Sequence, residues 1–224
     1  MSFRLSLKSN YVSLLFMQSS PPKIHNKGKR KTQDPCPVCF LHRDRCICEW
    51  IPSLTLKTKL TLVIHNSELR RTTNTGTLAV KALTNSELLV RGKIDEPLDL
   101  SQTLSEDYRS LLFYPCEEAI DLSAEFLSQS SLPIHLIVPD GNWRQASKVH
   151  YRHKEIEHLP RVMIKAENTE THHLRAESSK EGMATLQAIA HAMGIIEGDA
   201  VKDELLKLYN IKLERTLLGR GIVK

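Results

Sequence analysis

Apolar residues along this chain follow two alternating patterns. Short continuous runs that are rich in branched side chains and bounded by polar residues are typical of buried parallel strands, and the clearest is 133–138. Between such runs, apolar positions recur at helical spacing, as they do across 117–129. The patterns predict strands at 59–65, 86–91, 109–114, 133–138 and 161–165, and helices at 74–83, 117–129, from 142 onward, 183–193 and 203–218.

This alternation of strands and helices predicts an α/β fold, with a mainly parallel sheet and flanking helices. The helix after 133–138 has a defined start, because Asn142 and Gln145 form an Asn version of the capping box. Ligands of parallel sheets bind beyond the carboxyl ends of the strands. We therefore expect the chemistry in three loops that follow strands, at 66–76, 114–118 and 139–143.

The composition is that of a globular protein. The 224 residues are 41% hydrophobic and 25% charged, with a mean hydropathy of −0.29, which excludes a fibrous or wholly disordered chain. No apolar run approaches the roughly 18 residues that a membrane-spanning helix needs. The N-terminal run at 12–17 is too short for the core of a signal peptide. We therefore expect a cytoplasmic protein without a membrane partner.

The net charge of +5 is concentrated at the N-terminus. Residues 1–34 carry seven Lys or Arg and one acidic residue, whereas the remaining 190 residues carry 24 basic and 25 acidic side chains. A basic segment of this kind is typical of nucleic-acid binding. A solvated, disordered leader is the alternative explanation for the same composition.

Four of the five cysteines are close together in the sequence, in Cys36-Pro-Val-Cys39 and Cys46-Ile-Cys48. Two such pairs can place four thiolates around one Zn²⁺, and a site of four thiolates is structural because no position remains for water. An iron–sulfur cluster is the alternative for the same ligands. We expect a basic leader at 1–34, followed by a zinc knuckle at 35–52.

The loop Asp140-Gly-Asn-Trp143 contains two side chains suited to catalysis or base recognition. Asp140 could accept a proton or orient an amide, and Trp143 offers a stacking surface for a base. The structural alternatives are that Asp140 caps the helix and that Trp143 is a core residue. On the helix that follows, three basic residues are spaced four apart and share one face: Arg144, Lys148 and Arg152. This face could bind phosphates, and a solvated helix face is the alternative explanation.

The loop at 66–76 ends in a turn of small polar residues before a helix. Free backbone N–H groups at such a turn suit a carboxylate or a phosphate, and the basic pair Arg70-Arg71 precedes it. The signal is weak by itself, because the sequence has no Walker A and no G-x-G-x-x-G motif. The sequence also lacks a nucleophile elbow and an H-E-x-x-H helix, which disfavours the common hydrolases.

Taken in order, four stretches of this sequence resemble the DTW-domain proteins, the tRNA-uridine aminocarboxypropyltransferases. They span roughly 36–218, nearly the whole chain after the basic leader. One departure is Asn142, which stands where the family is named for a Thr; Asn caps a helix as well as Thr does, so we expect the turn to be kept. The four stretches are the cysteine knuckle, residues 65–79, Asp140-Gly-Asn-Trp143 with Ala146 and Lys148, and Leu174-Arg175 with 183–190.

The resemblance implies a SPOUT-like α/β catalytic domain at 53–224, for which a knotted C-terminal half is an option. It implies S-adenosylmethionine as co-substrate, transfer of its 3-amino-3-carboxypropyl group to N3 of a tRNA uridine, and release of methylthioadenosine. Two alternatives stay open at this point. One is an RNA methyltransferase that uses the same donor, and the other is a non-catalytic zinc-knuckle protein that binds RNA.

The resemblance also implies roles for particular residues. Asp140 would remove the uridine N3 proton or orient the substrate amide, and Trp143 would stack on the base or on the adenine. The residues expected to bind the donor are Arg71, Asn74, Thr75, Gly76, Tyr114 and Pro115. The residues expected to bind RNA, together with the basic leader, are Arg70, Arg144, Lys148, Arg152 and Arg175.

Overall fold

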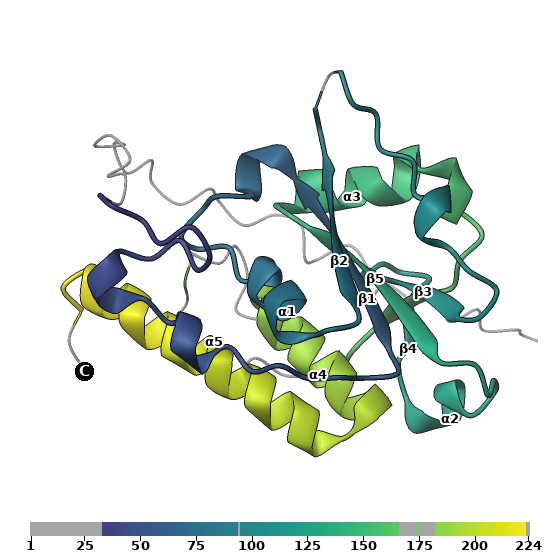
Figure 1. Cartoon of the computed structure of the whole chain (residues 1–224). Coiled ribbons are helices and arrows are strands. Elements are labelled where there is room, and N and C mark those ends of the chain that lie inside the picture. The colour runs from purple at the N-terminus through teal and green to yellow at the C-terminus, as the bar shows by residue number, and fades with distance from the viewer. Residues whose placement is uncertain (1–32, 94, 166–173, 175–181, 223–224) are drawn as a thin grey trace, which may run out of the picture. The chain divides into compact units, whose positions relative to one another are not determined.

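A six-stranded sheet forms the centre of the computed structural model, which describes residues 33–93, 95–165, 174 and 182–222 and, for Trp143, the backbone alone. The strand order is β2-β1-β5-β3-β6-β4 (Figure 1). Every strand pairing described in this sheet is parallel, so the predicted parallel α/β fold is confirmed. The strands are β1 (Lys59–His65), β2 (Ser86–Arg91), β3 (Arg109–Phe113), β4 (Ile120–Asp121), β5 (Ile134–Asp140) and β6 (Arg161–Met163).

Helices cover both faces of the sheet (Figure 1). One face is packed against α1 (Gly76–Ala82), α4 (Thr185–Glu197) and α5 (Asp199–Gly219), and the other against α3 (Trp143–Arg152). Side chains of β5 alternate between the two cores: Leu136 joins the α4 and α5 side, whereas Ile137 packs with the α3 side. Because β5 is buried on both faces, its sequence is a continuous apolar run rather than an alternating one.

The helix expected across 117–129 is wrong in its first half, where β4 pairs with β6. Leu122 continues that strand ladder by donating its N–H to the carbonyl of Met163 at 2.8 Å. Ser123 then caps the short helix α2 (Ala124–Leu127), because its hydroxyl accepts a backbone N–H of the first turn at 3.2 Å. A cap in the middle of the apolar repeat divides the expected helix into a strand and a helix.

Local sequence explains two further helix boundaries. The capping box predicted at the start of α3 is confirmed: Asn142 Oδ1 accepts the Gln145 N–H at 3.0 Å, and Gln145 Oε1 accepts the Asn142 N–H at 2.9 Å. The two C-terminal helices are confirmed; the first begins two residues later and ends four residues later than expected, and the second is longer at both ends. They are separated by Gly198, whose φ of 105° is the left-handed region that glycine adopts without steric cost.

Three expectations about the chain remain predictions. The basic leader at 1–34 lies almost wholly outside the described residues, which begin at 33. A knotted C-terminal half depends on the segments 166–173 and 175–181, which are also outside them. The domain boundaries at 35–52 and 53–224 are likewise untested. Among the described residues, no helix has both the length and the apolar character required to cross a membrane.

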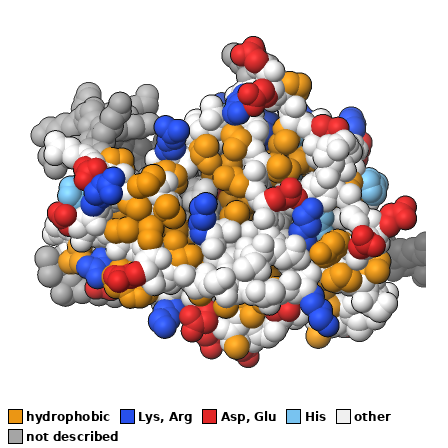
Figure 2. Space-filling view, in the orientation of Figure 1, with side chains coloured by type: hydrophobic (Ala, Val, Ile, Leu, Met, Phe, Trp, Pro, Cys, Tyr) orange, Lys and Arg blue, Asp and Glu red, His pale blue; other side chains and the backbone are white. Residues whose placement is uncertain are grey.

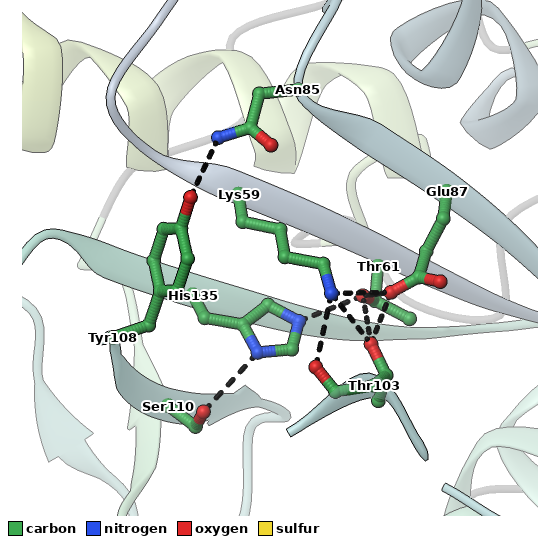
Figure 3. A network of polar contacts seen from close by, with 8 residues as sticks. All are labelled: Lys59, Thr61, Asn85, Glu87, Thr103, Tyr108, Ser110 and His135. Carbon is green, nitrogen blue, oxygen red and sulfur yellow. Dashed lines mark hydrogen bonds and ion pairs between the residues drawn. The ribbon is translucent and has the colours of Figure 1, made fainter. Parts of the chain in front are cut away.

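A buried polar network lies near the amino ends of the central strands (Figure 3). His135 is fully buried, with Nε2 at 2.7 Å from the Thr61 hydroxyl and Nδ1 at 3.2 Å from the Ser110 hydroxyl. Beside it, the Glu87 carboxylate accepts hydrogen bonds from Lys59 Nζ (2.9 Å) and from the Thr61 hydroxyl (2.7 Å). Burial lowers the pKa of His135 to about 4, and the Lys59 charge contributes to this shift.

Because the buried His135 imidazole has a lowered pKa, we expect the protein to lose unfolding free energy in mild acid. The pKa of His135 is about 4 in the fold and 6.5 ordinarily, so between these values the unfolded chain binds a proton that the folded chain does not. Lowering the pH from 7 to 5 should therefore remove about 2 kcal/mol of unfolding free energy through this residue. Urea unfolding of the wild type and His135→Gln at both pH values measures this. An equal pH dependence in the two proteins would contradict the prediction.

Candidate functional site

The carboxyl ends of β1, β5 and β3 lie side by side, because these strands are neighbours in the sheet. Ile64, near the end of β1, is paired with Asp140 at the end of β5. The loops at 66–76, 114–118 and 139–143 therefore leave the same edge of the sheet, which is where ligands of parallel sheets bind. The candidate residues that the sequence places on these loops are brought together at one edge.

Asp140 joins this edge to two helices. Asp140 is only 7% exposed. Its Oδ2 accepts a hydrogen bond from Asn74 Nδ2, and its Oδ1 accepts one from the Thr185 hydroxyl, each at 2.6 Å. A Cβ atom added to Gly76 would lie 2.9 Å from Asp140 Oδ2, so only glycine lets α1 begin this close to the carboxylate. Asp140 thus holds the start of α1 and the start of α4 against β5.

The turn before α1 is fastened by its own side chains. Asn74 Oδ1 accepts hydrogen bonds from the Thr77 N–H (3.1 Å) and from the Thr77 hydroxyl (3.0 Å). Thr75 Oγ1 accepts the N–H of Leu186 at 3.2 Å, which ties the turn to α4. Asn74, Thr75 and Gly76 are all buried. One of the helix-start N–H groups that the sequence suggested for an anion, that of Thr77, is therefore already occupied within the fold.

The two arginines of the first loop are exposed, as a role in binding would require. Arg71 Nη1 lies 3.1 Å from Glu68 Oε1, and the Glu68 side chain is 1% exposed. This ion pair places the Arg71 guanidinium beside the turn before α1 and satisfies the buried carboxylate. The structure describes no such ion pair for Arg70, which leaves this guanidinium accessible to a partner within the described part of the chain.

Tyr114 and Pro115 follow the end of β3. The Tyr114 ring is stacked on the His150 ring of α3, with centroids 5.9 Å apart and an interplanar angle of 26°. Burial raises the pKa of Tyr114, and Tyr151 and Cys116 add to the shift. Pro115 is exposed. Tyr114 therefore connects the loop at 114–118 to α3.

The four clustered cysteines form a compact group of sulfur atoms, all within 4.8 Å of one another. Cys36 Sγ lies 3.5 Å from Cys48 Sγ and 3.6 Å from Cys46 Sγ, and Cys39 Sγ lies 3.9 Å from Cys46 Sγ. A tetrahedral zinc ion with Zn–S bonds of about 2.3 Å requires sulfur separations of about 3.8 Å. The cluster therefore has the dimensions of a four-thiolate metal site.

The surroundings of the cluster act differently on its thiols, lowering the pKa of Cys36 and raising the pKa of Cys39 through burial. Burial opposes ionisation of Cys36, but hydrogen bonds from the backbone N–H groups of Cys39 and Val38 outweigh it and lower the pKa to about 6. The fully buried Lys212 of α5 donates from Nζ to the Cys39 carbonyl at 2.6 Å. By contrast, burial raises the pKa of Cys48. A metal must displace protons from such thiols, so its binding is pH-dependent.

Comparison with known proteins identifies the family to which this arrangement belongs. The family model of the DTW domain matches residues 33–217, most of the chain. This chain belongs to the DTW domain family. The matched region includes the cysteine cluster, the three strand-end loops and nearly all of both C-terminal helices, so the resemblance deduced from four stretches is confirmed.

Two curated proteins are similar to this DTW domain, and both are named tRNA-uridine aminocarboxypropyltransferase 2. The protein from Macaca fascicularis is 25% identical over 183 residues, which cover 79% of this chain and 61% of the relative. The protein from Mus musculus is 25% identical over 178 residues, which cover 77% and 60%. The chain thus spans about three fifths of the length of these relatives. No solved structure gave a significant match.

Three of the basic residues expected to bind RNA lie on α3 of the DTW domain. Arg144, Lys148 and Arg152 all lie within the helix, as their spacing predicts. Arg144 and Arg152 are exposed, and Lys148 is half-buried. Trp143 begins this helix, but its side chain lies outside the description. Arg175 also lies outside the described residues. Whether these residues bind RNA stays a prediction.

Sequence reasoning missed two residues of the DTW domain that the structure brings to this edge. Thr185 lies in the stretch 183–190 that carried the resemblance, but only the fold shows its hydroxyl on Asp140. Arg91 is the last residue of β2, and its Nη1 donates to the Gln145 carbonyl of α3 at 2.7 Å. A charged residue at the carboxyl end of a strand was the signal that could have identified Arg91.

Proposed function

We propose that this DTW domain protein is a tRNA-modifying transferase that moves the 3-amino-3-carboxypropyl group of S-adenosylmethionine to N3 of a tRNA uridine. The observation that carries the proposal is the match to the DTW domain family over 33–217. The two similar proteins are named tRNA-uridine aminocarboxypropyltransferase 2, and this name states the activity that we propose. The position of Asp140 at the carboxyl end of β5 supports it, because ligands of parallel sheets bind there.

The proposed reaction is a nucleophilic substitution at carbon. The bond between the sulfonium sulfur and the γ-carbon of the methionine moiety breaks, and a bond from uridine N3 to that carbon forms. The sulfur keeps the electron pair and becomes the neutral thioether of methylthioadenosine, while the N3 proton passes to a base. Because the sulfonium is already a good leaving group, the protein has mainly to position the reactants. Asp140 is proposed to accept the proton or to orient the uridine imide.

Two isotopic labels test this function. The full chain is incubated with unmodified tRNA and with donor labelled either in the carboxyl carbon or in the methyl group. We expect the carboxyl label in the tRNA and the methyl label in released methylthioadenosine. Methyl label in the tRNA, with S-adenosylhomocysteine as by-product, would instead identify an RNA methyltransferase. Failure of the donor to bind in a calorimetric titration would identify a non-catalytic RNA-binding protein.

The metal proposed for the cysteine cluster is structural zinc. Four sulfur ligands at tetrahedral separations leave no coordination position for water or substrate, so the ion would hold the segment in place and would take no part in the transfer. Cys36, Cys39, Cys46 and Cys48 would bind it. The packing of this segment on α5 supports a structural role, because two of the cysteines belong to the main core.

Charge on the described part of the chain is mixed rather than uniform. Figure 2 shows Lys and Arg side chains interspersed with Asp and Glu on one face of the molecule. Positive charge is grouped in the sequence at the aligned residues Arg144, Lys148 and Arg152 of α3 and in the basic leader at 1–34. These are therefore the proposed contacts to the tRNA backbone.

Binding of tRNA is expected to weaken as salt is added, because each phosphate contact releases counterions. Lys148→Ala should lower the slope of log affinity against log salt by about one, and deletion of residues 1–30 should lower it further. Lys207→Ala, an exposed position on α5, is the matched control and should change neither affinity nor slope. Binding titrations at several salt concentrations measure both quantities. If the deletion and Lys148→Ala both behave like the control, these charges have no role in RNA binding.

A further inference from the structure

Arg91 is a nearly buried cation at the end of β2. The residue is 7% exposed, and its Nη1 donates to the Gln145 carbonyl at 2.7 Å. Its Nε is buried and has no hydrogen-bond partner among the described residues. A guanidinium has five N–H donors and stays charged in proteins. Burying such a group with an unpaired donor is unfavourable unless an anion pairs with it.

The charges around Arg91 are mostly of the same sign. Burial lowers the pKa of Arg91, and the positive charge of Arg152 adds to this effect. Burial, Arg91 and Lys148 lower the pKa of His65, which is paired with Arg91 between β1 and β2. The acidic residue that acts on His65 is Glu68, whose carboxylate is already engaged in an ion pair. The cluster thus has an excess of positive charge.

Hydrogen bonds hold Arg91 and His65 in a fixed arrangement. Gln145 Nε2 donates to the Ser67 hydroxyl at 3.0 Å, and the same hydroxyl lies 2.9 Å from His65 Nδ1. Gly92 follows Arg91 with a φ of 81°, and a Cβ atom there would lie only 2.7 Å from His65 Nε2. Glycine therefore leaves room for the imidazole at the strand end. The ends of β1 and β2 and the first turn of α3 together position Arg91 before any ligand binds.

Arg91 and Asp140 project from opposite faces of the sheet. Residues two apart in a strand point the same way, so Arg91 shares the side of Leu89, which packs with the α3 core. Asp140 shares the side of Val138, which packs with the α4 and α5 core. An anion bound at Arg91 would therefore lie on the α3 side of the edge, apart from the Asp140 carboxylate.

We propose that Arg91, together with His65, Lys148 and Arg152, binds a backbone phosphate of the acceptor RNA. The inference rests on the proposed function and adds a contact that the sequence did not assign. A phosphate supplies the missing negative charge, and its oxygens match the planar fork of a guanidinium. Phosphate contacts fix the register of a nucleic acid without reading its bases. This site would anchor the tRNA on the α3 side while the target uridine reaches the Asp140 side.

Titrations of tRNA over a range of salt concentrations test this site in the full chain. Arg91→Gln is expected to weaken tRNA binding about tenfold or more and to lower the salt slope by about one. Arg91→Lys keeps the charge but lacks the fork, so it should weaken binding with a smaller change in slope. The exposed control Lys207→Ala should leave both unchanged. Binding of S-adenosylmethionine should be the same in all four proteins.

Two results would overturn the inference. One is unchanged tRNA affinity and slope in Arg91→Gln. The other is weaker binding of S-adenosylmethionine with unchanged tRNA binding, which would identify the anion as the donor carboxylate. A wild-type protein that binds tRNA through Arg91 but transfers no aminocarboxypropyl group would refute the proposed function and leave this site standing.

A double-mutant cycle keeps the test decisive if Arg91→Gln fails to fold. The cycle combines Arg91→Lys with Arg152→Gln, a change at an exposed position of α3. Two side chains that bind the same phosphate should give losses of tRNA affinity that are not additive. Additive losses would show that Arg152 and Arg91 act at separate places, which would also overturn the inference.

Discussion

Replacing Asp140 by Asn is expected to lower aminocarboxypropyl transfer by about 10²- to 10⁴-fold in a protein that still folds. The amide has the shape of the carboxylate: its oxygen can accept from Asn74, and its NH₂ can donate to the Thr185 hydroxyl. Both contacts that fasten the edge of the sheet therefore survive. What the amide lacks is the negative charge that would attract or remove the uridine N3 proton. Release of methylthioadenosine in the presence of tRNA, beside a thermal melt, measures the two properties separately.

Thr185→Val separates a chemical role of Asp140 from a positioning role. Valine removes the hydroxyl donor but leaves the carboxylate and nearly the same side-chain volume. If Asp140 handles the proton, Thr185→Val should retain most of the activity that Asp140→Asn loses. Equal losses in the two variants would make Asp140 a positioning residue. Near wild-type turnover in Asp140→Asn would assign it to structure and direct the search for a base to Glu68, to His65 or to His172, which lies outside the described residues.

Replacing Cys36 by Ser should remove the metal and destabilise the fold by several kcal/mol. Structural zinc contributes an apparent free energy of about 10–16 kcal/mol in zinc-finger peptides, which is comparable to the whole stability of a domain. Here Cys36 and Cys39 are buried in the same core as α4 and α5. Loss of the ion should therefore affect the melting of the whole core. Elemental analysis should find one zinc per chain in the wild type and little in the variant.

Cys116→Ser is the matched control, because this half-buried cysteine lies outside the cluster. It should retain the metal and melt close to the wild type. If elemental analysis finds iron and the protein absorbs visible light, the cysteines hold an iron–sulfur cluster and not zinc. A stable wild-type protein without metal would contradict a structural ion altogether.

Elements with a strong local signal could be predicted from the sequence. The apolar run of β5 and the Asn142–Gln145 capping box are both present as expected, because burial on two faces and a reciprocal cap are encoded within a few neighbouring residues. The helix expected at 117–129 was wrong in its first half because the structure there depends on a distant segment. Its apolar repeat fits a helix, but the pairing of β4 with β6 is a contact between distant segments. A local pattern contains no information on such a contact.

The candidate site shows the same division. Asp140 and Asn74 were both singled out by residue type and by position after strands, yet the 2.6 Å hydrogen bond between them joins residues 66 positions apart. The contact of Thr185 with Asp140 was missed because a threonine in a helical stretch has no local signal. Arg91 was missed because its significance lies in its burial and in the positive charge of Arg152, which α3 places near it.

The hydrogen bond from Lys212 to the Cys39 carbonyl has a consequence for the order in which the chain folds during synthesis. The two residues are 173 positions apart. The cysteine segment leaves the ribosome early, and the helix that covers it leaves more than 150 residues later. Domains usually fold as units once their sequence is complete. The cysteines can therefore take up a metal early, but the surface that buries Cys39 exists only after α5 has emerged. Until then, the cysteine segment lacks the cover that α5 provides in the complete fold.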